Sequence, residues 1–384
     1  MLRTSVAIAL VAGAAACTGS SHETGIDAAA PDVCEDLSDL SIVPIASSSP
    51  MAGWVNALAL DDDCVPHVAY LTEADSDATV WTAQVRDGLA DAEQVTEIGD
   101  HAHGRNISLA IDSEGRRHLV FGDDANGSGS VGYAIDDGGW AIDTVDSGSG
   151  DQGLGYKTSM ALAPDGTVHM AWEGGYAAGT FDDFYTQDFD GGSYFALTVD
   201  GDGKPLIVDQ TDDDRVRVNL FDGTTWSTLA EVDGDDGAYV GLYPDIAEQD
   251  GVIHLAYSAF ESGDAVEPRY ATNEGGAWVV DVLEHGDHVG HAPKLAVGDD
   301  GTVHLAYADI ANDLLRYGVR EPGGDWVLQD VTGLGDSCGT PGLELDWDQL
   351  NGTADIAVME SSVFVSYFSH GALCLASFPV GWAP

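Results

Sequence analysis

The chain has 384 residues, of which 66 are acidic and 13 are basic, so its formal net charge is −53 at pH 7. Nucleic acids and anionic membrane surfaces are bound through Lys and Arg side chains, and this balance excludes both as direct partners. A hydrophobic share of 44% with nine Trp residues excludes a disordered acidic chain, because such chains lack core-forming residues. The sequence therefore predicts a folded, strongly acidic protein.

Residues 1–17 have the features of an export signal. Arg3 gives a positive start, an apolar run covers residues 6–11, and alanines at 14–16 provide a small-residue cleavage site. The apolar run is too short to span a bilayer, which takes about 20 residues. We therefore expect an exported protein whose mature chain has no membrane-spanning helix.

The cysteine that ends this signal gives the chain a resemblance to bacterial lipoproteins. In the lipobox of that family, a Cys in the position of Cys17 carries the lipid and becomes the new N-terminus. Thr18 rather than Asp follows it, and by the sorting pattern of such lipoproteins this implies the outer membrane, facing the periplasm or the cell surface. The alternative is ordinary cleavage after Ala16, which would give a secreted protein. Residues 18–33 are small and polar, as expected of a flexible tether.

A unit of about 50 residues repeats through residues 41–384, within a predicted domain that covers residues 34–384. Its best copies are residues 295–307 (LAVGDDGTVHLAY) and 246–257 (IAEQDGVIHLAY), where an apolar strand, a turn with Asp and Gly, and an alternating strand follow one another. Seven equivalent positions mark the units: His67, His118, His169, Leu206, His254, His304 and Phe364.

Each unit continues with two more strands, joined in most units by a Gly-rich turn ahead of a Trp, as in residues 137–140 and 323–326. Gly and Asp supply the positive φ angles that tight hairpins need. Four antiparallel strands per unit are typical of a propeller blade. The predicted fold is therefore all-β, a seven-bladed β-propeller.

These units resemble the sialidase-like repeats of the BNR type, which are common in propellers of bacterial surface lipoproteins. The turns ahead of the Trp residues lie where that superfamily has its Asp-box, but they lack its leading Ser. The resemblance implies an architecture and no reaction. A sialidase needs three arginines that converge on a carboxylate, and here we place Arg105 alone near the channel mouth.

Two irregularities in the spacing of the repeats affect the predicted number of strands in one blade and the closure of the ring. Markers 169 and 206 are 37 residues apart, about one strand short, because residues 194–199 fit either the last strand of blade 3 or the first of blade 4. We therefore predict that one blade has three strands. The last unit supplies three strands and residues 41–46 resemble a fourth, so we expect the N-terminal strand to close the last blade.

Four cysteines remain besides Cys17. In an exported chain, an even number favours disulfides over a thiolate metal site. The propeller topology places Cys34 and Cys64 on one face at adjacent blades, and Cys338 and Cys374 on the opposite face within the last blade. We predict these two pairings, each stabilising the closure of the ring.

The histidines divide into two groups. Those that mark the repeat lie on equivalent strands around a ring and cannot converge, so we interpret them as structural. The others lie in the loops that enter blades 2 and 6, where their spacing would suit a transition metal, and solvated loop side chains are the alternative. This second group is His101, His103, His285, His288 and His291.

The same face gathers carboxylates and aromatic side chains in its loops. A ring of carboxylates would attract a hard cation such as Ca²⁺, and an acidic surface that merely stays hydrated is the alternative. The residues expected to contact a ligand are Trp54, Arg105, Tyr156, Lys157, Glu173, Tyr243 and Asp309.

The preferred functional hypothesis is a non-catalytic lipoprotein whose channel face binds a polysaccharide or a protein. One alternative is a carbohydrate-active enzyme, either a glycoside hydrolase or a polysaccharide lyase, that uses Glu173, Asp309 or Tyr243, although no spacing selects a carboxylate pair. Another is a propeller that binds a divalent cation. The sequence does not indicate an oligomeric state.

Overall fold

Twenty-eight strands, and no helix, make up the part of the chain that the computed structural model describes. That part comprises residues 37–46, 52–74, 77–98, 107–123, 129–147, 157–234, 237–260, 265–333, 338, 354–369 and 371–382. It lies within one compact unit, residues 33–384. No helix capable of crossing a membrane occurs in these residues.

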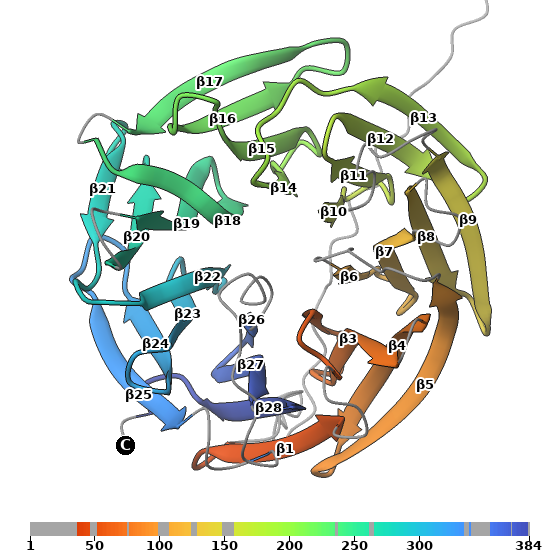
Figure 1. Cartoon of the computed structure of the whole chain (residues 1–384), viewed down its shortest axis with the longest axis horizontal. Helices are drawn as coiled ribbons and strands as arrows, with labels where there is room; N and C mark the ends of the chain where they lie inside the picture. The colour runs from red at the N-terminus through yellow and green to blue at the C-terminus, as the bar shows by residue number, and fades with distance from the viewer. Residues whose placement is uncertain are drawn as a thin grey trace, which may run out of the picture. The chain divides into compact units, whose positions relative to one another are not determined.

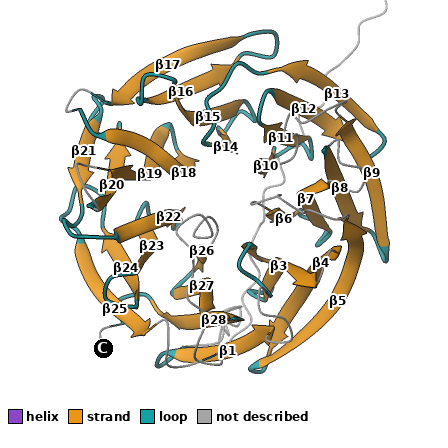
Figure 2. Ribbon diagram, viewed as in Figure 1, coloured by secondary structure: helices purple, strands orange, loops and turns teal. Residues whose placement is uncertain are grey.

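The strands form seven antiparallel sheets arranged in a ring (Figures 1 and 2), so the predicted seven-bladed propeller is confirmed. Blade 1 consists of β2 (Asn56–Leu60), β3 (Pro66–Ala74), β4 (Asp77–Arg86) and β5 (Leu89–Ile98). Blade 2 consists of β6 (Ile107–Ile111), β7 (Arg117–Asp123), β8 (Ser130–Asp136) and β9 (Trp140–Ser147). Blade 3 consists of β10 (Thr158–Leu162), β11 (Val168–Trp172), β12 (Gly175–Thr180) and β13 (Asp183–Asp188).

The remaining blades follow in the same order, with the first strand nearest the centre of the ring and the fourth on the outside (Figure 1). Blade 4 consists of β14 (Phe195–Val199), β15 (Pro205–Gln210), β16 (Val216–Phe221) and β17 (Trp226–Asp233). Blade 5 consists of β18 (Tyr239–Gln249), β19 (Val252–Phe260), β20 (Val266–Thr272) and β21 (Val279–Val282). Blade 6 consists of β22 (Val289–Val297), β23 (Val303–Asp309), β24 (Leu314–Arg320) and β25 (Val327–Gly333). Blade 7 consists of β26 (Ala354–Met359), β27 (Ser362–Ser369), β28 (Ala372–Pro379) and β1 (Ser41–Ala46).

Every blade has four strands, so the prediction of a three-stranded blade is wrong. Blade 3 has its own fourth strand, β13, and residues 195–199 form the first strand of blade 4. The repeat is short here because two-residue turns join β11, β12 and β13, with positive φ angles at Gly174 and Asp182. Such turns connect strands with the fewest residues that antiparallel pairing allows.

The N-terminal strand closes the ring, as the sequence predicts. β1 pairs antiparallel with β28, and Val43 lies opposite Leu375. Val43 belongs to an apolar cluster that also contains Leu58 and Val68 of blade 1 and Phe364 of blade 7. The closing strand therefore covers the edge of β28 and contributes to the contact between the last blade and the first.

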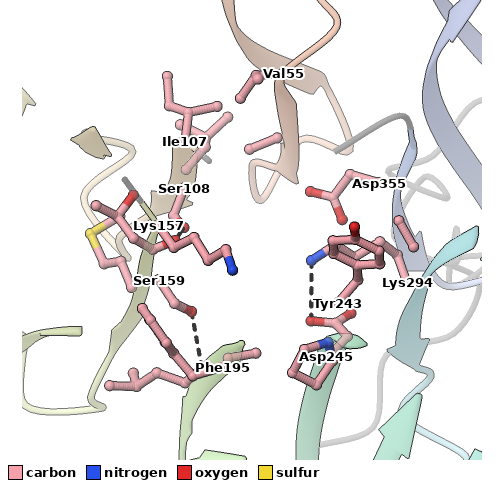
Figure 3. Close-up of a pocket in the computed structure, with 18 of the residues that line it drawn as sticks. Val55, Ile107, Ser108, Lys157, Ser159, Phe195, Tyr243, Asp245, Lys294 and Asp355 are labelled. Carbon is pink, nitrogen blue, oxygen red and sulfur yellow. Dashed lines mark hydrogen bonds and ion pairs between the residues drawn. The ribbon is translucent and has the colours of Figure 1, made fainter. Parts of the chain in front are cut away.

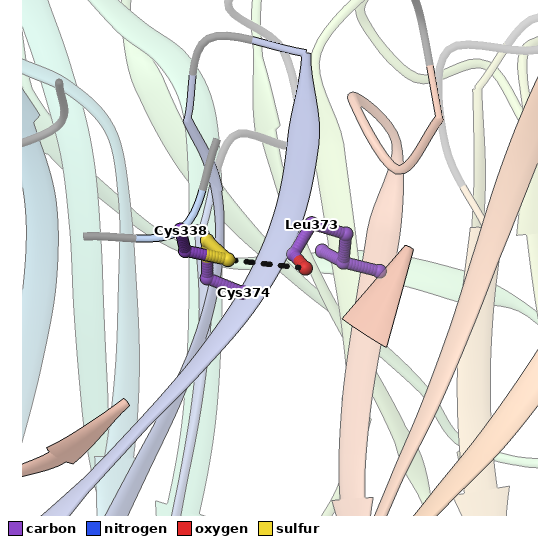
Figure 4. The surroundings of a disulfide bond; sticks show 3 residues. All are labelled: Cys338, Leu373 and Cys374. Carbon is purple, nitrogen blue, oxygen red and sulfur yellow. Dashed lines mark hydrogen bonds between the residues drawn. A yellow bond between two sulfur atoms is a disulfide. The ribbon is translucent and has the colours of Figure 1, made fainter. Parts of the chain in front are cut away.

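One of the two predicted disulfides lies wholly within the described residues. Cys338 is bonded to Cys374 (Figure 4), which confirms the pairing. Cys374 lies on β28, in register with Pro44 of β1. Cys64 is also disulfide-bonded. Its predicted partner, Cys34, lies outside the described residues, and so do Cys17 and residues 18–33.

The histidines that mark the repeat are buried inside the blades, as interpreted from the sequence, with exposures of 1% to 7%. In four blades the Nδ1 atom of the histidine lies 2.6 Å from a tyrosine hydroxyl on the third strand. The pairs are His118 with Tyr133, His169 with Tyr176, His254 with Tyr270, and His304 with Tyr317. These histidines therefore hold strands of a blade together.

Candidate functional site

A cavity of about 170 Å³ lies in the central channel and is lined by residues at the inner strands of all seven blades (Figure 3). In each blade, one residue of the first strand pairs with the repeat marker on the second strand. The residue two positions before it lines the cavity, and the seven residues at this position form one layer of the wall. The layer consists of Ala57, Ser108, Ser159, Ala196, Asp245, Lys294 and Asp355. Three consecutive blades, 5 to 7, therefore place ionisable side chains in the channel.

Side chains of this layer hydrogen-bond to the neighbouring blade. The backbone N–H of Leu197 donates to Ser159 Oγ at 2.9 Å and that of Leu295 to Asp245 Oδ2 at 2.9 Å. The N–H of Leu58 donates to Asp355 Oδ2 at 2.8 Å, which joins blade 7 to blade 1. An inner strand has one edge without a strand partner, and these contacts satisfy N–H groups on that edge. The layer thus also joins the blades.

Lys294 lies between the two carboxylates of the layer. Its Nζ atom is 3.6 Å from Asp245 Oδ1, and the two side chains are 26% and 19% exposed. Burial by itself lowers the pKa of Lys294, but the charges of Asp245 and Asp355 outweigh it and raise that pKa. Burial raises the pKa of Asp355 to about 6, with Asp245 adding to the shift and Lys294 opposing it.

A second group of cavity residues belongs to blades 3 to 5. Each member precedes the layer residue of its own blade by two positions. Lys157 donates from Nζ to the carbonyl oxygen of Ser193 at 2.7 Å, and the same atom is 3.3 Å from the centre of the Tyr194 ring. Tyr194 in turn meets Tyr243 edge to face, with ring centres 4.9 Å apart. Tyr243 has a φ angle of 51° and lies within the second register shift of β18, between Leu242 and Asp245. An irregular strand thus aims this tyrosine into the cavity.

The cavity gathers two of the three lysines in the chain, Lys157 and Lys294, while Lys204 lies in the turn between β14 and β15. In Figure 3, Lys157 points across the cavity toward the side that carries Lys294 and Asp355. The site therefore combines amino groups, carboxylates and two phenol rings in a chain that is otherwise poor in basic residues.

The structure brings together two of the ligand-contact residues predicted from the sequence, Lys157 and Tyr243. Trp54 is 7% exposed and belongs to an apolar cluster shared with Phe368 of blade 7, so its ring packs inside the protein. Asp309 is 3% exposed and accepts hydrogen bonds from the backbone and side chain of Asn312, so it holds the turn after β23.

The other predicted contact residues do not appear in the described wall of the cavity. Glu173 is partly exposed in the turn between β11 and β12. Arg105 and Tyr156 lie outside the described residues.

Sequence reasoning missed Tyr194, Asp245, Lys294 and Asp355. Counting back from the repeat marker would have found the last three, because each of them lies nine or ten positions before the marker of its unit. The signal is the strand position shared by all repeats.

Of the three histidines predicted in the loop that enters blade 6, His291 lies on β22, and only His288 and His291 lie side by side. His285 has a side chain 77% exposed and contacts Glu267 through Nδ1. His288 and His291 stack with ring centres 5.9 Å apart, and His291 is 3% exposed. Burial, aided by His288, lowers the pKa of His291 to about 4.

No group of three or more His, Cys, Asp or Glu residues suited to a metal ion occurs where side chains are described. His101 and His103, the other half of the predicted metal site, lie outside that part of the chain. The transition-metal and Ca²⁺ hypotheses stay predictions.

No family model matches the chain, and no curated protein matches its sequence, so the sialidase-like repeat family is not confirmed. Solved structures share the fold. An ulvan lyase of a new polysaccharide lyase family, bound to -[GlcA(1-4)Rha3S]-, has 14% identity and a TM-score of 0.53 over 87% of this chain and 94% of its own. The alpha-L-arabinanase of Penicillium chrysogenum, complexed with arabinobiose, has 11% identity and a TM-score of 0.51 over 90% and 100%. The polysaccharide lyase Uly1 has 10% identity and a TM-score of 0.51 over 84% and 89%.

Proposed function

We propose that this protein binds a carbohydrate chain at its propeller channel, as a non-catalytic module held outside the cytoplasm by a lipid on Cys17. The observation that carries the proposal is the cluster of Lys157, Tyr194 and Tyr243 at the channel cavity. Proteins of similar fold that act on polysaccharides or bind arabinobiose support it.

The chemistry of the cluster suits a sugar. Phenol rings offer an apolar face to the C–H groups of a sugar ring and a hydroxyl to its oxygens. Amino groups and carboxylates at the cavity, such as those of Lys294 and Asp245, supply donors and acceptors that orient a ligand. A cavity of about 170 Å³ is small and takes a single sugar unit of a longer chain.

A glycan array probed with residues 18–384 tests this function. We expect binding to one class of oligosaccharide, and we expect Tyr194→Ala to weaken it by about ten-fold or more because a stacking surface is lost. Tyr243→Gly removes the second ring without backbone strain, since glycine accepts the positive φ angle of this position. It should weaken binding similarly.

Tyr185→Ala is the matched control, because Tyr185 lies on the outer strand β13 and is 50% exposed. It should leave binding unchanged. An array without any bound glycan, or both channel variants binding as tightly as the wild type, would contradict the proposal.

A carbohydrate-active enzyme is the second candidate, and Asp355 is the observation that favours it. A carboxyl group with a pKa of about 6 in a cavity, beside a second carboxylate, has the properties of a general acid. Incubation of the bound glycan with the protein, followed by analysis of chain length, separates the candidates. If the wild type shortens the glycan and Asp355→Asn abolishes this cleavage, the protein is an enzyme and the binding-module proposal is wrong.

A further inference from the structure

We infer that the carbohydrate bound at the channel is uncharged, a neutral sugar chain recognised through its hydroxyl groups, and that chains bearing uronate or sulfate groups are rejected. This inference rests on the proposed function and names its ligand class. Three features carry it: the charge balance of the cavity, the contacts that its cations already make, and the field of the whole chain.

The charged side chains of the described cavity wall balance one another. Lys157 and Lys294 contribute two positive charges, and Asp245 and Asp355 contribute two negative charges when both are ionised. A site for an anionic sugar needs a surplus of cations, because a carboxylate or sulfate loses its hydration on entering a narrow channel. This wall offers no such surplus.

Both cations also have contacts within the protein. Lys294 lies 3.6 Å from Asp245, and the charge of Asp355 acts on it as well. Lys157 donates to the carbonyl of Ser193 and lies over the ring of Tyr194. An anion would have to displace these contacts and would meet two carboxylates in the same space.

The carboxylates match hydroxyl donors instead. Asp355 accepts the N–H of Leu58 at Oδ2 and that of Ile356 at Oδ1, and Asp245 accepts the N–H of Leu295 at Oδ2. Each carboxylate oxygen can accept a further hydrogen bond, and carboxylates accept only. Sugar hydroxyls donate such bonds, whereas ionised uronate and sulfate groups do not. The acceptors at the channel therefore select for hydroxyl-bearing, uncharged units.

The net charge of the chain also disfavours anionic ligands. A formal charge of −53 opposes the approach of any polyanion, and at physiological salt this field is felt within about 8 Å of the surface. Polyanionic glycans would thus be disfavoured before they reach the cavity, while neutral chains meet no such barrier.

Matched oligosaccharides test the inference. The probes are tetramers of galactose and of galacturonic acid, tetramers of glucose and of glucuronic acid, and sulfated forms of the neutral chains. We expect the bound chains to be neutral and each charged counterpart to bind at least about ten-fold more weakly. The affinity of the neutral chain should be unchanged between about 25 and 500 mM NaCl, because no charge is screened on binding.

A charge-removing variant tests whether the cavity itself rejects anions. Asp355→Asn leaves the described wall with a surplus positive charge, so binding of the charged counterparts should rise several-fold relative to the wild type. Asp182→Asn removes one charge from an exposed turn outside the channel, at a positive φ angle that Asn accepts, and should change nothing.

The outcomes separate the two claims. Charged chains that bind the wild type as tightly as neutral ones would overturn the neutral-ligand inference and leave carbohydrate binding intact. An Asp355→Asn variant that still rejects charged chains would overturn the argument that the charge balance of the cavity causes the rejection. No binding to any of the probes or to the array would overturn the proposed function itself.

Discussion

At the scale of single residues, the buried histidines show how the propeller holds polar groups in its interior. His118 contacts Tyr133 through Nδ1 and Asp112 through Nε2, so both ring nitrogens are satisfied. Burial is the largest cause of the lowered pKa of each marker histidine, and it brings those of His254 and His304 to about 4. These histidines are therefore neutral in the folded state at neutral pH.

The pH dependence of stability follows from these pKa values. A histidine with a pKa near 6.5 when unfolded and about 4 when folded binds its proton first in the unfolded state. The free energy of unfolding must therefore fall as the pH falls from 6.5 to 4, by an amount on the order of 3 kcal/mol for each such group. Asp355, whose pKa is raised to about 6, acts in the opposite direction but is a single group. Urea unfolding at pH 7, 6, 5 and 4.5 measures the slope.

Substitution of one histidine isolates its share of this slope. His304→Gln removes a titrating group and should flatten the dependence, whereas Tyr317→Phe removes its hydrogen-bond partner and should keep it. A stability that is constant between pH 6.5 and 4.5 would contradict the prediction.

At the scale of elements, the closing strand β1 shows why a propeller needs its two ends together. Without β1, the edge of β28 would face solvent, and Val43 would no longer cover Leu375. The sequence predicts this strand because the last unit supplies only three strands and residues 41–46 resemble the fourth. In the structure Val43 is buried, and Ser41 and Pro44 are exposed. The three-stranded blade was mispredicted because a strand pattern does not reveal how short its turns are, as at Gly174 and Asp182.

The closure predicts a strong contrast between two positions on β1. Val43→Asp places a charge where the side chain is 9% exposed and should lower the free energy of unfolding by about 2 kcal/mol or more. Ser41→Asp makes the same change at an exposed position of the same strand and should alter it by less than about 0.5 kcal/mol. Chemical denaturation measures both, and equal losses would mean that β1 does not pack as described.

At the scale of the whole molecule, an acidic surface surrounds a channel that holds both signs of charge. The −53 net charge favours solubility and opposes association with polyanions, and it does not bear on the choice of fold. We propose that the chain is exported and anchored by a lipid on Cys17, with residues 18–33 as its tether.

Metabolic labelling with palmitate in a bacterial host tests the anchor. The wild type should incorporate the label and fractionate with membranes, and Cys17→Ser should lose both properties because the thiol that carries the lipid is gone. Thr18→Ser keeps that thiol and should label normally. An unlabelled wild type released in soluble form would instead support ordinary cleavage after Ala16.

The amino-acid sequence was enough to predict the repeat, the number of blades, the closing strand and one disulfide. Each of these depends on a pattern that recurs along the chain or on which strands that pattern leaves unpaired. Lys157 and Tyr243 were also predicted as ligand contacts, but the three charged residues that share the cavity with them became evident from the structure alone. Asp245, Lys294 and Asp355 are about 50 to 60 residues apart in sequence and look like ordinary strand residues. These three side chains lie close together because neighbouring blades present the same strand position to one channel. Charges interact strongly only when they are close in space, so the folded structure is what allows the charges of Asp245 and Asp355 to shift the pKa of Lys294.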